Sequence, residues 1–94
     1  MKTIALTSQL KHQERVLKQE AAGTIVLLDL DGGHYYALDG TGGRAWELCD
    51  GQRRVSEIGR IIGDEYDAAA EHIEHDLIEL FSELANENLV ETNA

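Results

Sequence analysis

The chain has 94 residues, 43% of them hydrophobic and 28% charged, a composition typical of one globular domain and atypical of disordered or membrane-spanning chains. Its formal net charge is −10, and residues 61–94 account for it because they hold ten acids and no lysine or arginine. This acidic third should repel nucleic-acid phosphates, and it either forms a solvated face or attracts a basic partner.

The first part of the chain predicts a three-stranded antiparallel meander. Residues 1–14 are loosely patterned and are expected to form a flexible N-terminal arm. The segment 15–20 predicts a short edge strand, and 24–30 is a β-branched and leucine-rich run of strand length. Glycines in the turn at 31–33 supply the positive φ angles that a hairpin requires, so 34–38 is expected to return as the third strand.

Two short helices are expected next, because the hydrophobic period changes from two to about 3.6 after residue 39. Asp39 or Thr41 can cap the first helix, and Gly51 can follow its end. The second helix is expected from about Ser56 to near Gly63. The residues expected to face inward are Ala45, Trp46, Leu48 and Cys49 on the first helix, and Val55, Ile58, Ile61 and Ile62 on the second.

A third helix is the clearest element of the sequence. It is expected to start after Asp67, and Asn88, which tolerates the left-handed conformation, can end it. Ile78 and Ala85 lie to one side of its main apolar stripe, so the apolar face is wider than one core contact needs. The stripe itself consists of Ile73, Leu77, Leu80, Phe81 and Leu84.

Neither a membrane nor a disulfide is expected. The longest apolar run, residues 25–28, is far too short to cross a bilayer, and residues 1–12 lack the apolar core of a secretory signal. We therefore expect a cytoplasmic protein. Cys49 is the single cysteine, which excludes an internal disulfide and a cysteine-only zinc site. Its apolar neighbours Trp46 and Leu48 predict a buried, unreactive thiol.

One short motif is similar to a nucleotide-binding loop. Gly40, Gly42 and Ala45 spell the G-x-G-x-x-A of dinucleotide-binding folds after a strand and before a helix. That motif requires a parallel strand beyond the helix, whereas more helices are expected here. We interpret these glycines as residues that let the helix pack closely against the sheet.

Two further residue pairs have the chemistry of metal ligands. Asp29 and Asp31 precede glycine as in calcium loops, but strands rather than helices are expected on both sides. His72 and His75 can share a helix face with Glu71 or Glu79, although paired histidines on an exposed helix are more often solvated. We expect no metal, no cofactor and no catalytic residue.

Three stretches of the chain together form a recognisable pattern: TIVLLDLDGGHYYALDGTGGRAWELCDG, VSEIGRIIGDEY and IEHDLIELFSELANENLVE. The pattern resembles the PqqD-like family, the recognition elements for precursors of ribosomally synthesised and post-translationally modified peptides (RiPPs). The resemblance covers roughly residues 15–91 and implies one α+β, winged-helix-like domain. In that fold a three-stranded antiparallel sheet is followed by a three-helix bundle, in agreement with the elements expected above.

The resemblance also implies a function, that of a stand-alone, non-catalytic peptide chaperone. Such proteins bind the leader peptide of a precursor by β-strand addition to the third strand, beside the third helix. They present it to a tailoring enzyme such as a radical SAM maturase, or to a leader peptidase, in lasso-peptide, radical SAM or pyrroloquinoline quinone pathways. The peptide-binding residues implied are His34, Tyr35, Tyr36, Ala37 and Leu38 on the strand, with Ile73, Leu77, Ile78, Phe81 and Ala85 on the helix.

The alternation of side chains along a strand predicts that Tyr36 faces inward with Leu38, while Tyr35 and Ala37 face outward. Two other functions remain open. A winged-helix domain can bind DNA, although residues 67–88 hold seven acids and neither lysine nor arginine, which is the opposite of a recognition helix. The free strand edge can instead pair two copies of the chain, which would make it a self-associating interaction domain.

Overall fold

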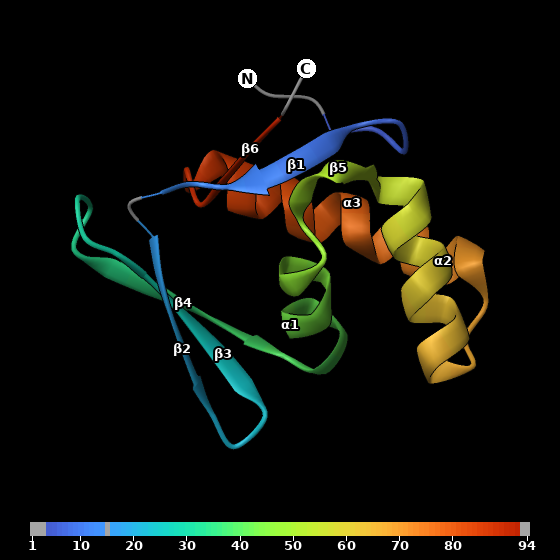
Figure 1. Ribbon diagram of the computed structural model, residues 1–94, viewed down its shortest axis with the longest axis horizontal. Coiled ribbons are helices and arrows are strands. Elements are labelled where there is room, and N and C mark those ends of the chain that lie inside the picture. The colour runs from blue at the N-terminus through green and yellow to red at the C-terminus, as the bar shows by residue number, and fades with distance from the viewer. Residues whose placement is uncertain (1–3, 15, 93–94) are drawn as a thin grey trace.

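The computed structural model describes residues 4–14 and 16–92, which form two small antiparallel sheets and three helices. The first sheet has the order β2–β3–β4 and the second the order β5–β1–β6. Helix α1 lies between the first sheet and α2 (Figure 1). The expected α+β class with a three-stranded antiparallel sheet and three helices is confirmed, and the second sheet is an addition to it.

The first sheet is the predicted meander, formed by β2 (Val16–Ala21), β3 (Thr24–Asp29) and β4 (His34–Asp39). Every second residue of β3 is buried, because one face of the strand packs on the core. In the β3–β4 turn, the Asp29 carboxylate accepts backbone hydrogen bonds from Asp31 and Gly32, and Gly33 adopts a φ of 70°. These contacts fix the turn and, with it, the β3–β4 register in which Leu27 faces Tyr36.

The second sheet was not predicted. Its strands are β1 (Gln9–His12), β5 (Asp50–Arg54) and β6 (Val90–Thr92), with β1 in the middle. Part of the segment 1–14, which the sequence predicts to be a flexible arm, is therefore a central strand. Leu10 has no exposed surface, and its burial stabilises the sheet that joins the two ends of the described chain.

The helices are α1 (Gly40–Glu47), α2 (Val55–Tyr66) and α3 (Ala70–Asn86). Asp39 precedes α1 as predicted, but its side chain makes no capping bond and accepts a hydrogen bond from Thr24 Oγ1 at 2.7 Å. Helix α2 continues past the predicted end at Gly63. Asn88, with a φ of 60°, follows the end of α3 as expected, and the backbone N–H of Leu89 donates to the carbonyl of Leu84.

The core lies between the sheets and the helices, and its largest fully buried side chains include Trp46 on α1 and Phe81 on α3. Cys49 is buried as predicted, and burial raises the pKa of its thiol to about 12. Among the residues described, no helix is both long enough and apolar enough to cross a membrane.

Candidate peptide-binding edge

Strand β4 lies at one margin of the first sheet. It pairs with β3 on one side, and within residues 4–14 and 16–92 no strand pairs with its other side. Tyr35 is 69% exposed and Ala37 is also exposed, whereas Leu38 is buried and Tyr36 is half-buried against the core. The predicted inward and outward faces are confirmed. An edge strand of this kind presents backbone N–H and C=O groups that an incoming strand can pair.

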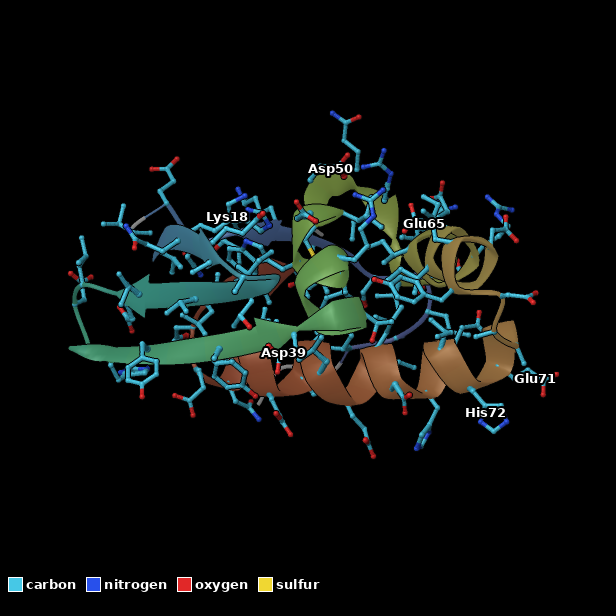
Figure 2. All side chains as sticks on the ribbon, turned by 90° about the horizontal axis from the view of Figure 1, so that it is seen from below. Lys18, Asp39, Asp50, Glu65, Glu71 and His72 are labelled. Carbon is cyan, nitrogen blue, oxygen red and sulfur yellow. The ribbon has the colours of Figure 1, made fainter. Side chains whose placement is uncertain are left out.

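Helix α3 runs beside β4, and two polar contacts connect them. The hydroxyl of Tyr36 donates a hydrogen bond to Glu83 at 2.5 Å, and His34 Nε2 lies 3.3 Å from the Glu87 carboxylate. The hydrogen bond to Glu83, with a smaller effect of burial, raises the pKa of the Tyr36 phenol to about 12. The phenol is therefore a proton donor throughout the physiological pH range. Seen from below, the two elements lie along one another (Figure 2).

The two elements also approach one another near Gly42, at the start of α1. A methyl group built on Gly42 would lie 3.7 Å from the Leu38 side chain and 3.8 Å from that of Leu80. Leu80, Glu83 and Glu87 therefore form the side of α3 that is turned toward β4, and we call these three residues the α3 flank. The sequence predicted the helix but not this flank, because only contacts with β4 show which border of the helix is turned toward the strand.

The structure brings only part of the predicted site together. His34, Tyr35, Tyr36, Ala37 and Leu38 form one strand as expected. On the helix, Leu77, Phe81 and Ala85 are buried in the core, so their side chains are not available to a peptide on the surface of this structure. Ile73 lies beside the backbone of Gly59 and so packs toward α2.

Two of the predicted helix residues point the wrong way. Successive residues of an α-helix are rotated by about 100°. Ile78 therefore lies about 180° around the helix from Glu87, and Ala85 lies about 160° from Glu83. Ile78 is half-buried against the core and Ala85 is buried. These positions turn both side chains away from β4, and the residues of α3 that lie near β4 are those of the α3 flank.

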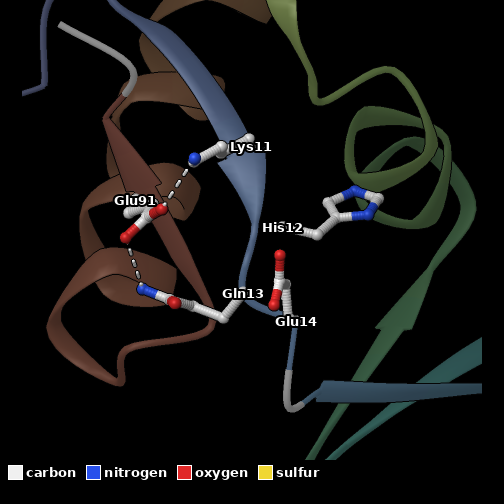
Figure 3. Close-up of a pocket in the computed structure, with 5 residues that line it drawn as sticks. All are labelled: Lys11, His12, Gln13, Glu14 and Glu91. Atoms are coloured by element: carbon white, nitrogen blue, oxygen red, sulfur yellow. Dashed lines mark hydrogen bonds and ion pairs between the residues drawn. The ribbon is translucent and has the colours of Figure 1, made fainter.

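A shallow pocket of about 370 Å³ lies elsewhere, on the second sheet (Figure 3). It is lined by Glu91 of β6 and by residues 11–14, at and just after the end of β1. Glu91 bridges Lys11 at 3.2 Å and Gln13 at 3.2 Å. His12 points away from them toward α1. Its ring stacks on Trp46 at 3.7 Å and its Nε2 lies 2.5 Å from the Trp46 carbonyl oxygen. These contacts tie β1 to β6 and α1, and burial lowers the pKa of His12.

The remaining sequence motifs have structural explanations. The element after α1 is β5, which pairs antiparallel with β1 in the other sheet, so the glycine-rich segment is not part of a βαβ unit. His75 is exposed, and its Nε2 lies 3.5 Å from a carboxylate oxygen of Glu79. In the part of the chain that the structure describes, no three histidine, cysteine or acidic side chains are placed to hold a metal ion.

Comparison with known proteins gives one family and several solved structures. Residues 24–90 match the family described as Coenzyme PQQ synthesis protein D (PqqD). The chain is 34% identical to TbiB1, solved in complex with the TbiA(beta) leader peptide, with a TM-score of 0.78 over 86% of this chain and 94% of that one. No curated protein sequence matches the chain.

Two more structures share the fold. One is the PqqD truncation of Methylobacterium extorquens PqqCD, described as a functional and stand-alone RiPP recognition element, with 25% identity and a TM-score of 0.81 over 95% of each chain. The other is lasso peptide synthetase B1 complexed with the leader peptide, with a TM-score of 0.78 over 88% of this chain and 98% of that one. At 17% identity this last match shows the fold alone.

Proposed function

This chain belongs to the PqqD family, and on that premise we propose that it is a non-catalytic recognition protein that binds the leader peptide of a ribosomally synthesised precursor. The observation that carries the proposal is the 34% identity to TbiB1, a protein solved with a leader peptide bound, over 86% of this chain and 94% of that one. In this role the protein holds the precursor for a separate tailoring enzyme, such as a radical SAM maturase, or for a leader peptidase.

The binding mode that the structure favours is strand addition at β4. A peptide in extended conformation can pair with the free backbone groups of the strand, and that pairing is independent of sequence. Its outward side chains would lie near Tyr35 and Ala37, which are exposed. Its inward side chains would meet the α3 flank, which is already within hydrogen-bonding distance of β4 at Tyr36. Backbone pairing then supplies affinity and the flank supplies selectivity.

The other margin of the sheet, β2, is a poorer candidate. Residues Leu17 to Ala21 of β2 are exposed, so its edge is also free to pair within the described part of the chain. However, α3 is joined to β4 by the contacts of Tyr36 and His34, so at β2 a guest strand would lack this second wall.

The single cysteine is not placed to act as a nucleophile. Cys49 is 2% exposed and its pKa is raised to about 12 by burial, so the thiol is neither accessible nor ionised at neutral pH. The DNA-binding alternative is disfavoured by α3, since the helix that would enter the major groove carries acids and no lysine or arginine.

The test is a titration of the ¹⁵N-labelled protein with synthetic peptides. The peptides are the N-terminal halves of the short open reading frames that lie next to its gene. We expect one of them to bind and to shift the backbone amides of His34–Asp39 and of the α3 flank. Methylation of alternate peptide amides should abolish binding in one register and leave it intact in the other, because only every second N–H of an added strand faces its partner.

Two tyrosines supply matched variants for the same titration. Tyr35→Ala should weaken binding about five- to thirtyfold, as for an aromatic contact worth about 1–2 kcal/mol. Tyr66→Ala should leave it unchanged, because Tyr66 is also exposed, at 49%, but lies at the end of α2. Equal effects of the two variants, or amide shifts confined to β2, would overturn the β4 site. Failure of every peptide to bind would overturn the function.

A further inference from the structure

Strand β4 and helix α3 approach one another at three positions, and at two of them the side chains are in polar contact. Going along β4, His34 lies opposite Glu87, Tyr36 opposite Glu83, and Leu38 near Leu80. The residue numbers rise along the strand and fall along the helix, so the two elements run antiparallel. An added strand would therefore meet the α3 flank in a fixed order.

The spacing of these three positions fits an extended peptide. Two residues of a strand advance about 6.8 Å. The step from Glu87 to Glu83 advances about 6 Å along a helix, and the step from Glu83 to Leu80 about 4.5 Å. Over the three positions the flank advances about 10.5 Å and a strand about 13.6 Å, so each member of the flank can lie within about 3 Å, along the strand direction, of one alternate residue. Side chains at positions i, i+2 and i+4 of a guest strand would each face one member of the flank.

Both charged residues of the α3 flank are negative. Residues 61–94 contain no lysine or arginine, and the partners that the structure gives Glu83 and Glu87 across the edge are a phenol and an imidazole. A carboxylate has two oxygens and about four acceptor positions, so each glutamate can accept further hydrogen bonds. A guest strand would also exclude water from the glutamates, which makes an apolar or acidic neighbour unfavourable and a cationic one favourable.

We propose that the leader strand recognised by this protein has the pattern apolar–x–basic–x–basic, read from its N-terminus, and that Glu83 and Glu87 determine this specificity. Antiparallel addition to β4 places the N-terminal end of the guest at Leu38, so its apolar residue packs on Leu80. The lysine or arginine two residues later meets Glu83, and the next one meets Glu87. This inference rests on the proposed function, because it assumes that the guest is a peptide strand on β4.

The experiment is selection from a displayed library of random 12-residue peptides on the wild-type protein at physiological salt. Each enriched peptide is then assigned to its site by the backbone amide shifts that it causes. We expect the peptides that shift His34–Asp39 to be enriched in lysine or arginine at positions i and i+2, with an apolar residue two positions before. Peptides that bind β4 with any other pattern would overturn the inference and leave the proposed function standing. Absence of any peptide that binds β4 would overturn both.

A charge-reversed variant gives the second arm of the test. In the double variant Glu83→Lys and Glu87→Lys, peptides selected on the wild type should bind at least tenfold more weakly, and a new selection should enrich aspartate and glutamate at the same positions. The control is Asp64→Lys with Glu71→Lys, two exposed acids away from the flank, which changes the net charge equally. Loss of affinity in both double variants would show a general charge effect and overturn the inference.

Discussion

Truncation of Phe81 to alanine is expected to remove much of the stability of the domain. The ring is part of the predicted peptide-binding wall in the sequence, yet it has no exposed surface in the structure and belongs to the core. Replacing a fully buried phenylalanine with alanine costs about 3–5 kcal/mol, because the lost burial is accompanied by a cavity. A domain of 94 residues has a total free energy of unfolding of about 5–14 kcal/mol.

The assay is urea and thermal unfolding followed by the fluorescence of Trp46, which is buried and is the only tryptophan. For Phe81→Ala we expect the midpoint temperature to fall by at least about 12 °C. Tyr35→Ala is the control and should change the free energy of unfolding by less than about 0.5 kcal/mol, since the side chain is largely exposed. A loss below about 1 kcal/mol for Phe81→Ala would refute the assignment of this ring to the core.

Three other properties follow from the hydrogen bonds and burial of single side chains. Titration followed by ultraviolet absorbance should show Tyr36 ionising near pH 12, and Glu83→Gln should move this pKa back toward the ordinary 10.0; an unchanged titration would contradict the hydrogen bond. Because burial lowers the folded-state pKa of His12 below 6.5, the unfolded chain takes up the proton first as the pH falls, so the melting temperature should be lower at pH 5.5 than at pH 7.5. His12→Phe, which retains a ring to stack on Trp46, should reduce that difference. An identical pH dependence in the variant would contradict the attribution of the effect to His12. Cys49 should react with a thiol reagent only as fast as the protein unfolds, so rapid modification of the native protein would show that the thiol is not buried.

The sequence predicts the first sheet and the helices well because their signals are local. The alternation that places Tyr36 inward and Tyr35 outward can be read from four adjacent residues, and the turn at Gly33 from one glycine. The apolar stripe of α3 likewise repeats within a single helix. Propensity and period are sufficient wherever a strand or helix presents one uniform face to the core.

The second sheet has no such local signal. Strand β6 has three residues, and β5 is mostly polar, so neither alternates over a length that predicts a strand. What holds β1 is pairing with segments far away in the chain, such as Leu10 with Thr92. The orientation of α3 relative to β4 cannot be predicted from the sequence for the same reason. Its apolar stripe has two borders, and only the contact of Tyr36 with Glu83 shows which border lies beside β4.

The position of β1 between β5 and β6 has a consequence for how the protein is made. A ribosome releases residues 9–12 long before residues 90–92. Strand β1 therefore cannot pair with β6 until nearly all of the described chain has emerged. Pairing between segments so distant along the chain closes slowly. We therefore expect this sheet to be completed at the end of folding, and the meander with α1 to form earlier during synthesis.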